Sequence, residues 1–271
     1  MPELPEVETT CQGITPHLLN QGITNVIVRQ AKLRWAVPAS LAAKLTGQTI
    51  VSINRRGKYL LIDTTNGTVI MHLGMSGSLR IVPSTTEPDK HDHLDIVLTN
   101  HHCLRLRDPR RFGAVLWKKE NPLQHKLLIN LGPEPLSDAF NGEYLFKASR
   151  HRKIAIKQFI MNSHIVVGVG NIYANEALFI AGIRPTIGTG RINRQRIDQL
   201  VGAIKLVLSK AIKAGGTTLR DFTASDGRPG YFQQQLNVYN RNNEPCPQCG
   251  NTIILRQQNQ RASYYCRHCQ T

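Results

Sequence analysis

Apolar residues near the start of the chain recur at helical spacing, at Val7, Cys11, Ile14 and Leu18. Because residues three or four positions apart share one face of a helix, the pattern predicts an amphipathic helix over residues 4–19. Pro5 suits the first turn of this helix, where a backbone N–H has no intrahelical partner to lose. The first predicted element is therefore a helix with one buried face.

The hydrophobic period changes to that of strands between residues 24 and 118. Residues 59–62 and 69–71 are apolar and flank Thr-Thr-Asn-Gly at 64–67, which is typical of a β-hairpin. Residues 94–98 and 104–106 flank a second turn in the same way. Several short strands joined by regular turns favour a β-sandwich.

Helical spacing returns after Gly-Pro-Glu-Pro at 132–135, where the glycine and prolines indicate a hinge. Residues 156–160 and 172–181 predict two short helices. An apolar stripe over residues 197–212 predicts a long helix that ends at two glycines. Residues 217–235 have no periodicity, and a loop of that length is typically functional or mobile.

The balance of charge is the first functional clue. Lys and Arg number 34 against 18 Asp and Glu, which gives a net charge of +16. Such a charge favours a polyanionic partner, although an ordinary basic surface explains it equally well. No run of about 18 apolar residues indicates a membrane span. The acidic start has no apolar signal-peptide region, so we expect a cytoplasmic protein.

Four of the six cysteines form two close pairs, and these pairs are the most specific motif. Cys246-x2-Cys249 is followed after sixteen residues by Cys266-x2-Cys269, which is the spacing of a tetrahedral four-cysteine zinc site. Four protein ligands leave no open position, so the expected Zn²⁺ is structural. The residues between the pairs predict a hairpin whose turn contains residues 257–261. The other two cysteines lie in apolar patterns and are expected to be reduced packing residues.

Pro2 offers a second kind of chemistry. If Met1 is removed, Pro2 carries a free secondary amine, and such an amine is partly neutral near pH 8. Attack on an aldehyde-like carbon gives an iminium, which is an electron sink for β-elimination. Glu3 lies next to it and can exchange protons with a substrate. Taken alone, the same residues are also typical of an ordinary helix start.

Four loop segments complete the set of candidates. Residues 55–58 concentrate positive charge, and residues 73–77 and 108–113 place a methionine and a phenylalanine in loops. An exposed Met or Phe is costly unless it meets an apolar partner such as a base stack, although each segment alone is consistent with an ordinary turn. Residues 167–171 lack the third glycine of a dinucleotide-binding motif and indicate a turn before a helix that can hold a phosphate.

In this order the motifs resemble the bacterial formamidopyrimidine-DNA glycosylases (the Fpg/MutM family), which are base-excision repair enzymes, over nearly the whole chain. The motifs are Pro2-Glu3-Leu4-Pro5-Glu6-Val7-Glu8, Gly57-Lys58-Tyr59-Leu60, His72-Leu73-Gly74-Met75-Ser76-Gly77, Lys90-His91-Asp92-His93, Asp108-Pro109-Arg110-Arg111-Phe112-Gly113, Leu131-Gly132-Pro133-Glu134-Pro135-Leu136, Val169-Gly170-Asn171-Ile172-Tyr173 and the four cysteines.

The resemblance implies an α+β fold with an N-terminal β-sandwich led by a helix. A helix–two-turn–helix domain and a four-cysteine zinc-finger β-hairpin follow it. The implied divisions are a catalytic domain over 1–131, a linker over 132–150, a DNA-binding domain over 151–236 and the finger over 237–271. The loop after Thr217 resembles the loop that closes over a flipped base.

The resemblance also assigns roles to individual residues. Pro2 matches the Schiff-base nucleophile and Glu3 the proton donor. Lys58 matches the residue that assists β-elimination, and Arg261 the one that serves δ-elimination and phosphate binding. Positions that match DNA contacts are His72, Met75, His91, Arg110, Phe112, Arg152 and Asn171. Among these, Met75, Arg110 and Phe112 match the wedge that fills the base stack.

The implied activity is that of a DNA glycosylase and AP lyase acting on 8-oxoguanine opposite cytosine and on formamidopyrimidines. We expect damaged double-stranded DNA as the partner, one structural Zn²⁺, no membrane, a monomer, and a bacterial cytoplasmic, nucleoid-associated location. One rival is an endonuclease VIII-like enzyme for oxidised pyrimidines, which usually has Gly where this chain has Leu4. The others are a non-catalytic zinc-finger DNA-binding protein and an RNA binder, which leaves the N-terminal motif unexplained.

Overall fold

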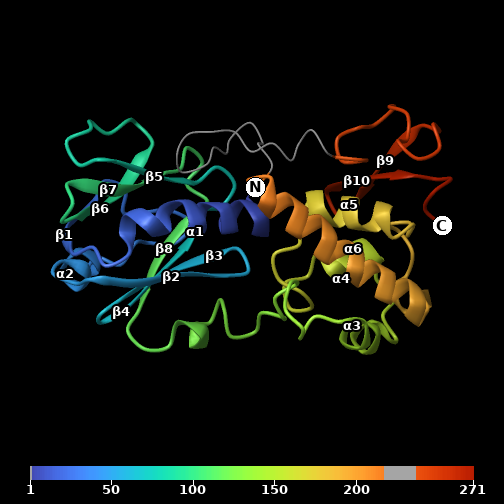
Figure 1. The fold of residues 1–271 in the computed structure, drawn as a ribbon, viewed down its shortest axis with the longest axis horizontal. Coiled ribbons are helices and arrows are strands. Elements are labelled where there is room, and N and C mark those ends of the chain that lie inside the picture. The colour runs from blue at the N-terminus through green and yellow to red at the C-terminus, as the bar shows by residue number, and fades with distance from the viewer. Residues whose placement is uncertain (1, 217–235) are drawn as a thin grey trace. The chain divides into compact units, whose positions relative to one another are not determined.

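A computed structural model describes residues 2–216 and 236–271, which form two compact units (Figure 1). One unit contains residues 2–129 and 214–216, and the other contains residues 130–213 and 236–271. The loop expected over residues 217–235 lies outside the described residues. The predicted four-part division into domains stays a prediction.

The first unit contains two helices, a 3-10 turn and eight strands in its described part. They are α1 (Leu4–Leu18), β1 (Ile23–Val28), α2 (Leu41–Leu45), β2 (Ile50–Arg56), β3 (Tyr59–Thr64), β4 (Gly67–His72), β5 (Ser78–Pro83), β6 (Asp92–Leu98), β7 (His102–Arg107), β8 (Ala114–Lys118) and η1 (Pro122–Gln124). The predicted helix over residues 4–19 ends one residue earlier, and both predicted hairpins are present as β3–β4 and β6–β7.

The strands form two antiparallel four-stranded sheets, in the orders β1-β6-β7-β5 and β2-β3-β4-β8. Helix α1 packs against strands of both sheets, as Figure 1 shows. Apolar residues of both sheets and of the buried face of α1 form one core, which includes Ile14, Leu60 and Leu104. The two cysteines outside the finger, Cys11 and Cys103, are buried in this unit. The β-sandwich and the α+β class are therefore confirmed.

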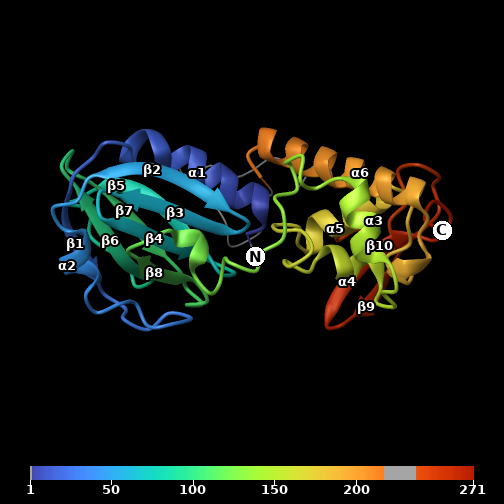
Figure 2. The ribbon, with the colours of Figure 1, turned by 90° about the horizontal axis from the view of Figure 1, so that it is seen from below.

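The second unit is helical, with one hairpin. It contains α3 (Gly142–Ser149), α4 (Ile156–Ile160), α5 (Asn171–Ile180), η2 (Thr189–Arg191), α6 (Arg194–Lys213), β9 (Ile253–Gln258) and β10 (Arg261–Cys266) (Figure 2). The apolar stripe of α6 is buried, as its spacing predicts. Helix α3 lies inside the segment that the sequence treats as a linker, and it packs against α6. No described helix is long and apolar enough to span a membrane.

Candidate active site and zinc centre

The start of α1 holds Pro2 and Glu3 in a buried position. Glu3 is the N-cap residue, and its side chain accepts a hydrogen bond from the backbone N–H of Glu6. In return the Glu3 N–H donates to Glu6 Oε2 at 2.8 Å, which completes a capping box. Pro2 is buried and Glu3 is only 2% exposed. The residue pair assigned to nucleophile and proton donor is therefore fixed relative to the axis of α1.

Lys58 lies in the tight turn between β2 and β3, which is tied to the same helix. Gly57 has a φ of 58°, a left-handed conformation that glycine adopts without strain. Arg55 donates to Glu8 on α1 at 2.6 Å and to the Gly57 carbonyl at 3.0 Å. Among the basic residues of this segment, Arg55 therefore holds the turn against α1. Lys58 is part of the turn that Arg55 holds.

His72 ends β4 and is held as a neutral ring. Burial, followed by the positive charges of Lys58 and Arg34, lowers the pKa of His72 to about 4. The Gly74 N–H donates to Nδ1 at 2.9 Å, and the ring lies 4.8 Å from that of Tyr59, centroid to centroid. Because Nδ1 is the acceptor, the proton of the neutral ring is on Nε2. His72 can therefore donate one hydrogen bond without carrying charge.

A buried carboxylate joins the two loops that carry the predicted wedge residues. Asp108 is fully buried, and its two oxygens accept from the Ser76 hydroxyl at 2.7 Å and from the Gly113 N–H at 2.7 Å. The Arg110 N–H in turn donates to Ser76 Oγ at 3.2 Å. The Asp108 N–H donates to the carbonyl of His91 at 3.0 Å. One side chain thus fixes the loops over residues 73–77 and 108–113.

These two loops bring Met75, Arg110 and Phe112 to the surface together. Met75 is 37% exposed and Phe112 is 45% exposed, and the Arg110 guanidinium lies 5.0 Å from the centre of the Phe112 ring. The loops touch so closely at Gly74 that a Cβ there would lie 2.3 Å from the backbone of Phe112. Exposed apolar side chains on braced loops are suited to meeting an apolar partner.

Arg261 follows a two-residue turn of the finger hairpin. Asn259 and Gln260 have φ angles of 44° and 60°, as in a type I′ turn, so the hairpin is longer than predicted and its turn is shorter. The buried amine of Lys157 on α4 donates to Ala262 O at 2.6 Å and to Ser263 Oγ at 2.8 Å. Arg261 also lines a small cavity of about 180 Å³ beside Lys157.

Asn171 is the first residue of α5, directly after the glycine turn, as the sequence predicts. Its side-chain oxygen is buried and has no hydrogen-bond partner among the described residues. Backbone N–H groups at a helix start, together with such a side chain, are suited to binding an anion. Arg152 is exposed in the segment between α3 and α4.

The four paired cysteines gather into one cluster, with all four sulfur atoms within 4.8 Å of one another. The distances from Cys246 to Cys269 and from Cys249 to Cys266 are 3.8 and 3.5 Å between Sγ atoms. A tetrahedral Zn²⁺ with Zn–S bonds of about 2.3 Å places its sulfurs about 3.8 Å apart. The donor set and its spacing fit one structural Zn²⁺, so the cofactor prediction is confirmed.

The structure groups the predicted site residues by unit. Pro2, Glu3, Lys58 and the two wedge loops lie in the first unit, and Arg152, Asn171, Arg261 and the cysteines lie in the second. Sequence reasoning gave no role to three buried charged residues that hold site segments. They are Asp108, Lys157 and Glu176, the last of which accepts from the backbone N–H groups of residues 237–239. Lys157 and Glu176 each lie within an apolar stretch of the sequence. That pattern could have indicated a buried charged residue with a supporting role.

Comparison with known proteins covers the whole chain. Residues 1–115 match the formamidopyrimidine-DNA glycosylase N-terminal domain, residues 131–223 the H2TH domain of that family, and residues 243–271 a zinc finger found in FPG and IleRS. The formamidopyrimidine-DNA glycosylase of Nitrosococcus oceani is 59% identical over 270 residues, which cover 100% of each chain. That of Shewanella loihica is 57% identical and covers 100% of this chain and 99% of its own.

Solved structures agree with the sequence comparison. The crystal structure of MutM (FPG) from Thermus thermophilus has a TM-score of 0.89 at 35% identity and covers 99% of this chain and 98% of its own. A Lactococcus lactis FPG mutant in complex with a Fapy-dG containing DNA has a TM-score of 0.93 at 32% identity and covers 99% of each chain. Full-length identity well above 30%, with a matching fold, shows that the chain belongs to the formamidopyrimidine-DNA glycosylase family.

Proposed function

We propose that the protein is a DNA glycosylase and AP lyase that excises 8-oxoguanine opposite cytosine and formamidopyrimidines from double-stranded DNA. The observation that carries the proposal is the buried pair Pro2 and Glu3, locked by a capping box at the start of α1. The Lactococcus lactis relative in complex with a Fapy-dG containing DNA supports the class of substrate.

The chemistry begins with the amine of Pro2, once Met1 has been removed. The amine attacks C1′ of the damaged nucleotide, the C1′–N bond breaks, and Glu3 supplies a proton during the release of the base. The amine then loses its proton to the ring oxygen O4′, the C1′–O4′ bond breaks, and the sugar opens to an iminium between C1′ and Pro2. Loss of a C2′ proton expels the 3′ phosphate, and a second elimination expels the 5′ phosphate. We assign the support of these two steps to Lys58 and Arg261.

The wedge loops explain how a base inside the stack is reached. Extruding a damaged base costs a few kcal/mol, and a side chain that fills the gap offsets part of that cost. Met75 is suited to fill the gap, with Arg110 facing the orphaned base and Phe112 packed beside it. His72, His91, Arg152 and Asn171 are assigned to the DNA backbone. Zn²⁺ stiffens the hairpin that carries Arg261 and takes no chemical step.

A borohydride trapping assay on a labelled duplex tests the nucleophile. We expect the wild-type protein to form a covalent complex with DNA that contains 8-oxoguanine or an abasic site. An uncleavable N-terminal extension blocks the amine and should abolish the complex, whereas Pro2→Gly keeps a primary amine and should leave a residual complex. If the extended protein still formed the complex at the wild-type yield, the nucleophile would be a lysine, with Lys58 the first candidate.

Glu3→Gln separates base release from strand cleavage. This variant keeps the amine but lacks the proton donor, so it should lose activity on 8-oxoguanine and retain more cleavage at a pre-formed abasic site. A protein that binds DNA without catalysis would give no complex in either assay. We further propose that the protein acts as a monomer in the cytoplasm, in association with the nucleoid. Gel filtration against standards tests the monomer.

A further inference from the structure

Among the described residues, the basic side chains of two regions differ in their partners. In the sheet β1-β6-β7-β5, arginines pair with aspartates: Arg29 and Arg105 bind Asp95, and Arg80 binds Asp92, at 2.6 to 2.9 Å. In the second unit, His151, Arg152, Lys153, Gly188, Gly190 and Arg191 line an open pocket of about 810 Å³. The side chains of Arg152, Lys153 and Arg191 are exposed, and none of them forms an ion pair with a carboxylate of the described residues.

The walls of this basic pocket are fixed by the backbone. The Gly190 N–H donates to the carbonyl of Arg152 at 2.8 Å, and the Thr189 N–H donates to that of Ile154 at 2.9 Å. An isolated β-bridge joins Ala155 to Gly188. The two segments that carry the three cations are therefore held side by side, and the pocket does not depend on its side chains for its shape.

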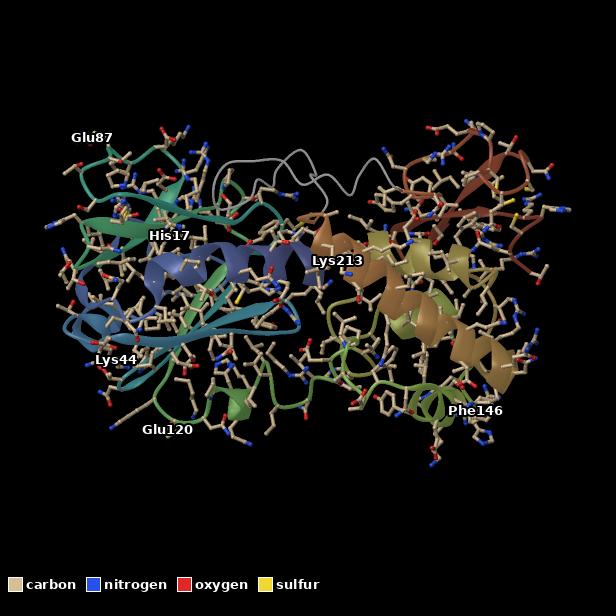
Figure 3. All side chains as sticks on the ribbon, in the orientation of Figure 1. His17, Lys44, Glu87, Glu120, Phe146 and Lys213 are labelled. Carbon is tan, nitrogen blue, oxygen red and sulfur yellow. The ribbon has the colours of Figure 1, made fainter. Side chains whose placement is uncertain are left out.

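Arg150 has a different use from its basic neighbours. Its guanidinium donates to the carbonyls of Gly190 at 3.0 Å and Ile192 at 2.8 Å. It also lies 4.0 Å from the centre of the Phe146 ring on α3, a residue labelled in Figure 3. Arg150 is thus a brace for the segment over residues 190–192 and does not line the pocket, whose cations are Arg152, Lys153 and Arg191.

Three cations around one concave site repel one another unless an anion enters between them. The site lies one short helix away from the cavity that Arg261 lines. Residues 151–153 directly precede α4, whereas Lys157 and Gln158 on α4 line the Arg261 cavity. The residues that line the basic pocket and those that line the Arg261 cavity do not overlap, so the two are separate sites.

We propose that the basic pocket holds a backbone phosphate of the DNA duplex, separate from the phosphate assigned to Arg261, and that Lys153 and Arg191 bind it together with Arg152. The proposal rests on the proposed function, because it takes DNA as the ligand. It adds Lys153 and Arg191 to the DNA interface and excludes Arg150 from it.

Salt dependence of DNA binding gives the first test. In Lys153→Gln/Arg191→Gln the log–log slope of affinity against salt should fall by about 0.9, the value for one lost phosphate contact. Affinity should fall about tenfold for damaged and undamaged duplexes alike, because phosphate contacts carry no sequence information.

The matched control is Lys147→Gln/Lys210→Gln, which removes the same charge from exposed positions on α3 and α6. Its slope should stay at the wild-type value. Equal losses in the two double variants would mean that only overall charge matters, and the proposal would be overturned. Circular dichroism confirms that both variants are folded.

A scan with neutral methylphosphonate linkages locates the contact. Neutralising one linkage at a time in a duplex with a single abasic-site analogue, which fixes the register of the bound protein, should reveal one position that weakens binding by the wild-type protein and leaves binding by the pocket variant unaffected. The proposal would be overturned if every neutral linkage weakened DNA binding by the pocket variant as much as it weakened binding by the wild type. Tripolyphosphate bound by the wild type and not by the variant, with no such position in DNA, would assign the pocket to a free anion instead. The wild type could show the single sensitive linkage, and the pocket variant could lack it, while no covalent complex forms with borohydride. In that case the proposed function would fail and the phosphate site would stand.

Discussion

The β-sandwich and the zinc finger reach rigidity by different routes. In the described part of the sandwich, twenty-three buried apolar side chains from the helices α1 and α2, both sheets and the segments between them form one core. The finger cluster has only five buried members, Phe179, Val238, Cys246, Ile253 and Cys266, and two of them are zinc ligands. Small modules cannot bury enough apolar surface to fold alone, so a metal supplies what the core does not. The β-sandwich and the zinc finger should therefore unfold under different conditions.

Loss of zinc should have the largest effect, and only on the finger. Structural zinc contributes about 10–16 kcal/mol in finger peptides, so Cys249→Ser should lose the metal and collapse the hairpin that carries Arg261. DNA binding should be lost while the thermal transition of the sandwich persists. Zinc content, circular dichroism and anisotropy with labelled DNA measure the three quantities. Cys103→Ala, in the buried sandwich, is the control and should keep its zinc. Full DNA affinity in Cys249→Ser would refute the role of the finger.

A cavity in the sandwich should have the reverse effect. Leu60 is fully buried between the sheets, and Leu60→Ala should lower the free energy of unfolding by about 2–5 kcal/mol. Urea unfolding followed by circular dichroism measures the loss, and the zinc content should remain that of the wild type. Release of zinc at the same urea concentration as sandwich unfolding would show that the two regions unfold as one, which contradicts the comparison.

The pH dependence of the sandwich sharpens the contrast further. The folded pKa of His72, about 4, is below its ordinary value of 6.5, so protonation favours the unfolded chain. The contribution of this group is complete above pH 6.5 and is lost as the pH falls toward 4. At pH 5 the loss is about 2 kcal/mol. His72→Asn keeps an acceptor for the Gly74 N–H, so the urea midpoint of this variant should change less between pH 5 and pH 7 than that of the wild type. The lower pH is about one unit above the folded pKa of His72, and the higher pH is just above its ordinary pKa.

His102, which is exposed on β7, provides the control for this measurement. His102→Asn should leave the wild-type pH dependence in place. A steep dependence that survives in His72→Asn would assign the titration to another group.

The smallest expected effect separates charged contacts from neutral ones. Lys58→Gln in the sandwich unit and Arg261→Gln in the finger should each lower the salt slope of DNA binding by about 0.9, for damaged and undamaged DNA alike. His72→Asn should weaken binding without changing the slope, because the ring carries no charge to replace a counterion. Titrations between 50 and 200 mM salt, which is roughly the range over which such slopes are resolved, provide the measurement. A slope that Lys58→Gln leaves unchanged would remove that residue from the phosphate contacts.

Periodicity predicted the regular elements well where one face is buried. Helix α1, the β3–β4 and β6–β7 hairpins and the long α6 all have an apolar side that the core covers. The zinc ligands were equally accessible, because a tight turn places both thiols of each cysteine pair beside one ion. Local spacing is sufficient for both kinds of feature.

Local spacing in the sequence did not predict the features that depend on partners far away along the chain. The finger strands extend through Gln257 and Gln258, whose side chains alternate across a ribbon with little core beneath it, so the expected turn was too long. Helix α3 is short, is held by its packing on α6, and fully buries only Leu145 and Ser149. Asp108 and Lys157 find partners 32 and 105 residues away, and no local pattern encodes such pairs.

The burial of Cys11 and Cys103 has a consequence for oxidative damage. Burial raises the pKa of Cys11 to about 11 and also raises that of Cys103, so both thiols stay protonated and react slowly with peroxide, which attacks thiolates. The zinc-bound thiolates of the finger are then the sites at which an oxidant acts first. Oxidative inactivation should accordingly proceed in step with the release of zinc, and a reductant with added Zn²⁺ should restore DNA binding, because the sandwich has kept its fold throughout.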